Sequence, residues 1–139
     1  MASRLNNQVA LITGASRGIG RAIADAYVRE GARVALVATD AAKLQALQQS
    51  WGVGPDRVMT LAVDVRDRQA CVQAVERVHA QWGGVDILVN NAGIYRAKPF
   101  LDYSDQDFQE LLDVNLFGVL HFMQACLPDM QAKRRGSIV

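Results

Sequence analysis

The chain has 139 residues, of which 50% are hydrophobic and 21% are charged, and its formal net charge at pH 7 is +1. A chain of this length can bury about two-thirds of its unfolded surface. Its apolar, nearly neutral composition excludes an intrinsically disordered segment and a polyanion-binding surface. We therefore expect one domain over residues 1–139 and no nucleic acid as a partner.

The first predicted element is a strand over Val9–Ile12, an apolar run typical of a buried parallel strand. A helical pattern follows from Arg21, and the stretch between them, residues 13–20, is T-G-A-S-R-G-I-G. A helix that begins at such a turn offers free N–H groups and the positive end of its dipole, which attract an anion. The stretch therefore predicts a phosphate-binding turn.

Each glycine of this turn has a separate expected role. Gly14 permits a tight reversal of the chain, Gly18 lets the backbone approach a ligand, and Gly20 lets the helix pack closely on the sheet. The spacing G-x-x-x-G-x-G is a variant of the dinucleotide fingerprint G-x-G-x-x-G, and it lacks the lysine and hydroxyl of a P-loop. Taken alone, the turn is either a dinucleotide site or a tight turn without a ligand.

Strands and helices are predicted to alternate along the rest of the chain. Further strands are expected at 34–37, 58–63, 85–89 and 136–139, with helical patterns at 41–47, 71–82, 105–112 and 115–131. Because the strands are apolar on both faces, we expect an α/β fold of the Rossmann type, a doubly wound parallel sheet with helices on both faces. The chain ends inside the fifth strand, so we expect an incomplete domain.

The helix predicted at 115–131 is the longest. Six apolar side chains are expected to line one of its faces: Leu116, Val119, Leu120, Met123, Leu127 and Met130. Pro128 should kink this helix or end its regular part. The basic run at 133–135 follows the helix and is interpreted as a C-terminal cap, because cations are favourable at the carbonyl end of the dipole.

Cys71 and Cys126 lack C-x-x-C spacing and lie in apolar helical patterns, which favours buried free thiols in a reducing compartment. His79 and His121 have no partner at metal-ligand spacing, so we assign them neither a metal nor a catalytic role. No N-terminal apolar segment precedes the first strand, and no apolar run approaches the roughly 18 residues of a membrane span. We expect a cytoplasmic protein without a bound metal or a membrane partner.

Four motifs stand in order along the chain: T-G-A-S-R-G-I-G at 13–20, Asp64-Val65, N-N-A-G at 90–93, and Val114-Asn115. In this combination the chain resembles the short-chain dehydrogenase/reductase family over nearly its whole length. Among subfamilies it is most similar to bacterial 3-oxoacyl-[acyl-carrier-protein] reductases and the alcohol and sugar dehydrogenases close to them. The resemblance implies an NAD(P)-dependent oxidoreductase that transfers hydride between nicotinamide and a small carbonyl or alcohol substrate.

The resemblance also implies a set of cofactor-binding residues: Gly14, Ser16, Arg17, Gly18, Ile19, Gly20, Thr39, Asp64, Val65, Asn91, Ala92 and Gly93. The glycine turn would contact the pyrophosphate, Asp64 with Val65 would hold the adenine, and residues 91–93 would flank the adenosine ribose. These segments follow predicted strands, and doubly wound sheets bind ligands at the carboxyl ends of their strands. From the residues alone, Asp64 is equally an N-cap of the third helix.

The choice between NAD and NADP depends on the end of the second strand, where an acidic side chain would bind the ribose 2′-hydroxyl of NAD. Ala38 stands at this place, Thr39 can donate a hydroxyl, and Arg17 can pair with the 2′-phosphate of NADP. We therefore expect NADP as the cofactor, with NAD as the alternative. Asp40 could also reach the ribose, although capping the next helix is the preferred interpretation.

In the family that the chain resembles, a serine and a Tyr-x-x-x-Lys motif carry the proton chemistry. None of the chain's tyrosines, Tyr27, Tyr95 and Tyr103, has a lysine four residues later. Only Asn115 matches a catalytic position, as the asparagine that supports a proton-relay water; a helix-capping or buried amide is the alternative.

We expect the complete protein to be an NADP(H)-preferring enzyme and a homodimer or homotetramer, as the family usually is. The 139-residue chain alone should be inactive. The alternative is a non-catalytic dinucleotide-binding module or fragment.

Overall fold

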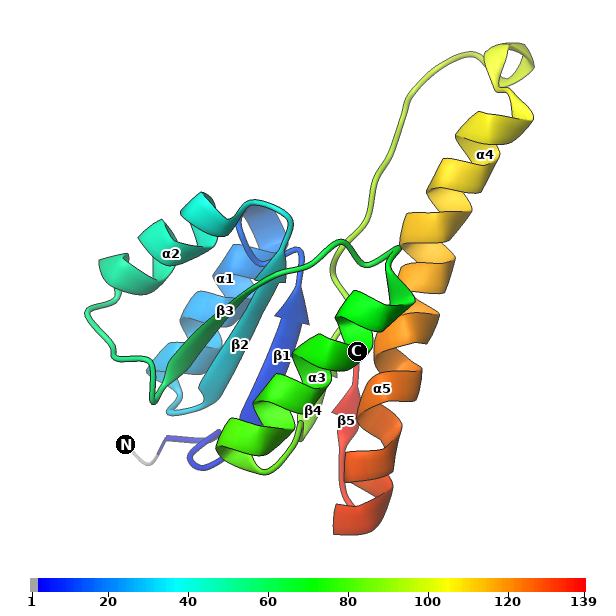
Figure 1. The fold of residues 1–139 in the computed structure, drawn as a ribbon. Helices are drawn as coiled ribbons and strands as arrows, with labels where there is room; N and C mark the ends of the chain where they lie inside the picture. Colours follow the sequence, from blue (N-terminus) through cyan, green and yellow to red (C-terminus); the bar gives the residue numbers. More distant parts are fainter. Residues whose placement is uncertain (1–2) are drawn as a thin grey trace.

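The computed structural model describes residues 3–139. The elements in chain order are β1 (Val9–Thr13), α1 (Gly18–Arg29), β2 (Arg33–Ala38), α2 (Ala41–Ser50), β3 (Val58–Ala62), α3 (Arg68–Trp82), β4 (Ile87–Val89), η1 (Phe100–Asp102), α4 (Asp105–Leu112), η2 (Asp113–Phe117), α5 (Gly118–Lys133) and β5 (Ser137–Ile138). All strand pairs are parallel, and the strand order is β3-β2-β1-β4-β5 (Figure 1). The predicted doubly wound α/β fold is confirmed.

Helices cover both faces of the sheet (Figure 1). Successive side chains of a strand point to opposite faces. Leu11 therefore packs in one core cluster with Cys71 of α3 and Phe122 of α5. Its neighbour Ile12 packs in a second cluster with Leu44 of α2. The helices on the two faces do not cover the carboxyl ends of the strands. The segments that follow β1 to β4 come together there.

The predicted free thiols are confirmed, because Cys71 and Cys126 are both buried and unpaired. Each side chain is fully removed from solvent, at 0% exposure. Burial raises the pKa of each thiol to about 12, so both are protonated at neutral pH.

Helices α4, η2 and α5 form one helical stretch, Asp105–Lys133, with a π-helical turn at Asp113–Phe117 (Figure 1). The predicted break between a short and a long helix is therefore a change of helix type rather than a loop. α5 continues through Pro128 to Lys133, so Pro128 does not end the helix.

The predicted buried face of the long helix was wrong for most of its residues. The residues of α5 that are buried are Gly118, His121, Phe122, Cys126 and Met130. Of the six side chains expected on one face, only Met130 is buried, whereas Leu116, Leu120 and Leu127 are 55%, 36% and 36% exposed. The helix carries apolar residues on two faces, so periodicity could not identify which face meets the sheet.

The stretch Asp105–Lys133 also has the length and composition of a membrane span, with a mean hydropathy of 1.3 over 18 residues, of which 22% are buried. The expectation that no apolar run approaches this length was therefore wrong. The core helix of a globular domain can have the same length and composition. Phe122 and Cys126 of this stretch are fully buried against the sheet, as in a core helix.

A buried carboxylate joins the amino ends of β1 and β4 to the end of α5. Asp86 is 3% exposed, and its Oδ2 accepts a hydrogen bond from the Val9 backbone N–H at 2.9 Å. Its Oδ1 lies 3.0 Å from Lys133 Nζ and 3.7 Å from an Arg135 guanidinium nitrogen. Lys133 lies in the last turn of α5, as the cap interpretation expects, and Arg134, with φ of +54°, is the C-cap, while the side chains of Lys133 and Arg135 also reach Asp86.

We predict that Asp86→Ala lowers the free energy of unfolding by about 3 kcal/mol, because it leaves the Val9 N–H and the Lys133 ammonium without their acceptor. Urea denaturation measures this change. As a control, Arg29→Ala removes an exposed ion pair with Asp25 and should cost no more than about 0.5 kcal/mol. Equal losses in the two variants would contradict the assignment.

Candidate functional site

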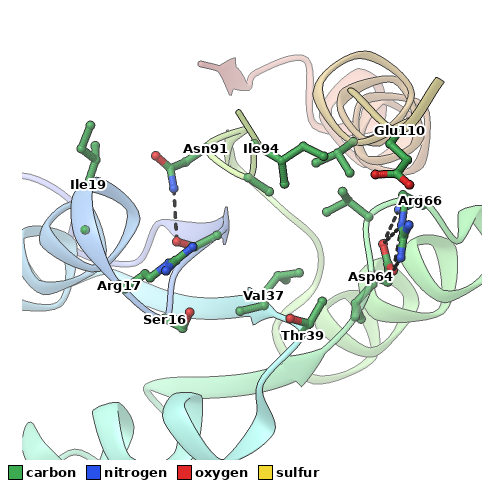
Figure 2. Close-up of a pocket in the computed structure, with 18 of the residues that line it drawn as sticks. Ser16, Arg17, Ile19, Val37, Thr39, Asp64, Arg66, Asn91, Ile94 and Glu110 are labelled. Atoms are coloured by element: carbon green, nitrogen blue, oxygen red, sulfur yellow. Dashed lines mark hydrogen bonds and ion pairs between the residues drawn. The ribbon is translucent and has the colours of Figure 1, made fainter. Parts of the chain in front are cut away.

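The carboxyl ends of β1 to β4 open into one pocket of about 590 Å³ (Figure 2). The turn after β1, the end of β2 and the loops after β3 and β4 all line it, since parallel strands end at the same edge of a sheet. The residues predicted to bind a cofactor that do line it are Gly14, Ser16, Arg17, Gly18, Ile19, Thr39, Asp64, Val65, Asn91, Ala92 and Gly93. Gly20 and Asn115 do not line it.

Several lining residues were not among the predicted cofactor-binding residues: Val37, Val63, Arg66, Ile94, Arg96, Glu110 and Val114. Most of them lie next to or within a predicted motif, so their position beside that motif could have indicated that they line the pocket. Arg96 and Glu110 had no such signal, because their ion pair of 2.9 Å joins the loop after β4 to α4 and arises only from the fold.

The glycines of the turn meet different physical constraints. Gly18 has φ of +58°, and a Cβ added there would meet nothing within 4 Å, so its backbone borders open space. A Cβ on Gly20 would lie 2.2 Å from the Gly14 carbonyl oxygen, so a side chain there would force α1 away from the turn. Gly20 therefore packs behind the pocket wall, whereas Gly18 forms part of its surface.

The end of β4 holds the glycine turn in place. The Thr13 hydroxyl accepts hydrogen bonds from the backbone N–H groups of Asn91 and Ala92, at 3.0 and 2.9 Å. The Asn91 side-chain amide donates to the carbonyls of Thr13 and Gly14, both at 3.2 Å. Figure 2 shows Asn91 directed at this turn. The structure thus assigns Asn91 a bracing role between two pocket walls.

The amino end of α1 differs from those of α2, α3 and α4. The side chains of Asp40, Asp67 and Ser104 cap α2, α3 and α4, respectively, whereas α1 has no side-chain cap. The N-cap position of α1 is Arg17, which lines the pocket. Among residues 3–139, no carboxylate forms an ion pair with its guanidinium, unlike those of the two other lining arginines. This end of the pocket is therefore electropositive.

Asp64 and Arg66 form an ion pair at the far side of the pocket (Figure 2). The Arg66 guanidinium lies 2.6 Å from Asp64 Oδ2, and the Arg66 backbone N–H donates to Oδ1 at 3.0 Å. The side-chain hydrogen bond from Arg66 lowers the pKa of Asp64, so this carboxyl is ionised at neutral pH. The alternative role of Asp64 as an N-cap was wrong, since Asp67 caps α3 through the Ala70 N–H.

The end of β2 presents Ala38 and Thr39 to the pocket. Asp40 is not among the lining residues, and its side chain accepts a hydrogen bond from the Lys43 N–H at 3.1 Å as the N-cap of α2. The preferred cap interpretation of Asp40 is therefore confirmed. No residue at this strand end brings a carboxylate to the pocket within the described part of the chain.

Asn115 lies in the π-helical turn η2 and binds the loop after β4. Its Oδ1 accepts from the Ile94 N–H at 2.8 Å, and its Nδ2 donates to the Ile94 carbonyl at 2.9 Å. The side chain is thus occupied by a loop backbone. It caps no helix, and Ile94, which it holds, lines the pocket.

This arrangement, a parallel doubly wound sheet with a glycine turn at an uncapped helix end, defines a dinucleotide-type site. The family model for short chain dehydrogenases matches residues 8–139, and the chain belongs to this family. Its relatives include a sorbitol dehydrogenase of Cereibacter sphaeroides, 41% identical over 96% of this chain and 51% of the relative. The 3-oxoacyl-[acyl-carrier-protein] reductase FabG of Escherichia coli is 37% identical over 95% of this chain and 53% of its own length.

Solved structures agree with this assignment. A short-chain dehydrogenase/reductase from Brucella melitensis, described as a glucose/ribitol dehydrogenase, has a TM-score of 0.88 at 36% identity and covers 93% of this chain. The chain covers 54% of that protein. It likewise spans about half the length of the curated relatives that it matches. Members of this family use nicotinamide cofactors, so the fold and the family agree on the kind of ligand.

We predict that Gly20→Ala lowers the free energy of unfolding by about 2 kcal/mol, because its methyl group would overlap the Gly14 carbonyl. Gly52→Ala is the control, since Gly52 has nothing within 4 Å of an added Cβ and its φ of +63° leaves only backbone strain, whereas Gly20 has helical backbone and an overlap. In this control, the strained backbone alone should lower the free energy of unfolding, by about 1 kcal/mol. Denaturant titration of both variants separates overlap from strain, and an equal loss would refute the packing role.

Proposed function

We propose that the protein is an NADP(H)-preferring oxidoreductase and that this chain is its cofactor-binding domain. It would transfer hydride between the nicotinamide and a small carbonyl or alcohol substrate. The observation that carries the proposal is the pairing of an uncapped helix end with an unpaired Arg17 beside a strand end that lacks a carboxylate. Such a site favours a ligand with several phosphates.

The lining residues suit separate parts of the cofactor. The first-turn N–H groups of α1, from Gly18 onward, would hold the pyrophosphate, and the bare backbone of Gly18 allows a close approach. Arg17 and Thr39 would bind a 2′-phosphate on the adenosine ribose. Asp64 and Val65 would hold the adenine, while residues 91–93 would flank the ribose. Ser16 and Ile19 also line this part of the pocket.

The bound cofactor supplies or accepts the hydride at its nicotinamide ring. The residues of this chain bind and orient it; none of Tyr27, Tyr95 and Tyr103 begins the Tyr-x-x-x-Lys motif for the proton step. Asn115 would contribute by holding the Ile94 backbone at the pocket. We propose that the proton-transferring residues follow Val139 in the complete protein.

The relatives' names support the proposed substrate class. These include a sorbitol dehydrogenase, a galactitol 2-dehydrogenase of Agrobacterium fabrum and a 3-oxoacyl-[acyl-carrier-protein] reductase. All these names point to alcohol or carbonyl chemistry, which supports a carbonyl or alcohol substrate here.

We further propose a cytoplasmic homo-oligomer, a dimer or tetramer. The second apolar face of the long helix, with Leu116, Leu120 and Leu127 exposed, supports self-association, because a large apolar surface is unfavourable in water. The free thiols Cys71 and Cys126 suit a reducing compartment.

We predict that Arg17→Gln in the complete protein lowers kcat/KM with NADPH by about tenfold or more, because it removes a charge-assisted contact to the 2′-phosphate. The value with NADH, which lacks that phosphate, should change less than about twofold. Arg96→Gln is the control, since the Arg96 guanidinium is paired with Glu110 and should affect both coenzymes equally. Equal efficiency of the unaltered enzyme with NADH and NADPH would defeat the NADP preference.

The purified 139-residue chain should show no NADPH-dependent carbonyl reduction, since it carries no Tyr-x-x-x-Lys motif. Sustained NADPH oxidation by this chain would overturn the assignment of the proton step to later residues. Sequencing the gene past Val139 tests the alternative of a non-catalytic module: a following Tyr-x-x-x-Lys motif supports the enzyme, and an immediate stop supports the module.

A further inference from the structure

The long helix holds the loop after β3 through one side chain that the sequence analysis left without a role. His121 is 8% exposed and lies in the second turn of α5. Its Nδ1 is 2.8 Å from the Val65 carbonyl oxygen. A carbonyl oxygen can only accept, so Nδ1 carries the proton and donates it. This hydrogen bond joins residues 56 positions apart in the chain.

Two neighbours restrict Val65 further. A Cβ on Gly118, one turn before His121, would lie 2.6 Å from Val65 Cγ2, so the helix approaches this loop closely only because Gly118 has no side chain. The Cys71 thiol also lies 3.5 Å from the Val65 carbonyl and donates to it. The raised pKa of this thiol keeps its proton in place. The carbonyl therefore has two donors, of which the imidazole is the stronger.

The Val65 carbonyl and the Arg66 N–H belong to one planar peptide group. The Arg66 N–H donates to Asp64 Oδ1 at 3.0 Å, on the opposite edge of that plane. Fixing the carbonyl therefore also fixes the direction of the N–H and the carboxylate bound to it. The chain of contacts runs from His121 to Asp64 without a break, and both Asp64 and Val65 line the pocket.

We propose that His121 is a positioning residue for the adenine end of the cofactor, acting on Asp64 through the Val65–Arg66 peptide. This inference rests on the proposed function, in which Asp64 and Val65 hold the adenine. Without the imidazole donor, only the weaker Cys71 thiol holds the Val65 carbonyl, so the peptide can tilt and shift the carboxylate that the Arg66 N–H and guanidinium hold. The nicotinamide end, bordered by other loops, is unaffected.

The test measures the binding of two cofactor halves to the complete protein by calorimetry: 2′,5′-ADP for the adenosine end and nicotinamide mononucleotide for the other. His121→Leu should weaken 2′,5′-ADP about threefold to tenfold and leave nicotinamide mononucleotide unchanged. His121→Asn should restore binding, because its amide nitrogen occupies the place of Nδ1. Should His121→Leu fail to fold, His121→Gln replaces it, since its amide lies one bond further out.

His79→Leu is the matched control. The His79 Nδ1 also makes a 2.8 Å contact between α3 and α5, to Asp129, but Asp129 does not line the pocket, whereas Val65, the partner of His121, does. This variant should lose stability without a change in the affinity for either half. Equal weakening by His79→Leu and His121→Leu, or no rescue by His121→Asn, would overturn the positioning role.

The same measurements test cofactor binding and the role of His121 separately. If the unaltered protein binds neither 2′,5′-ADP nor NADPH at millimolar concentration, the proposed function itself is wrong. If it binds both, and His121→Leu binds 2′,5′-ADP as tightly, only the role of His121 is refuted.

Discussion

The packing of the glycine turn against the end of β4 is the interaction on which the pocket depends. Thr13 and Gly14 accept four hydrogen bonds from Asn91 and Ala92, which join the ends of two neighbouring strands. Thr13 is 2% exposed, so water competes little for these bonds. The turn therefore has its shape before any ligand arrives, and a ligand that fits it does not have to order it.

Most of the fold could be predicted because its signals are local. Apolar runs identify strands, and a glycine turn between a strand and a helix identifies where they connect. The position of the pocket could also be predicted from the sequence, since residues that directly follow parallel strands must meet at one edge of the sheet. What local reasoning could not decide was which aspartate caps α3: Asp64 and Asp67 have the same chemistry, and only the position of the Arg66 guanidinium separates their roles.

The long helix shows the limit of periodicity. Because it is apolar on two faces, the pattern of Leu116, Leu120 and Leu127 is as regular as that of the buried Phe122 and Cys126. The residues that actually direct its contact with the pocket loops are a glycine and a histidine, types with no helical apolar signal. Their partners are more than fifty positions away in the chain, so local sequence patterns cannot reveal these contacts.

The close contact of Gly20 with the Gly14 carbonyl bears on how the glycine motif should be understood across related chains. Two of the three glycines meet requirements of the sheet and helix themselves, so a descendant that had lost its ligand would still be under pressure to keep them. Of the three glycines, only Gly18 borders open space, and within residues 3–139 Arg17 is the charged lining residue without an ion pair. Substitutions at Gly14 or Gly20 therefore report on folding, and one at Gly18 does so in part because its φ of +58° strains other residues, whereas drift at position 17 would mark a loss of the ligand.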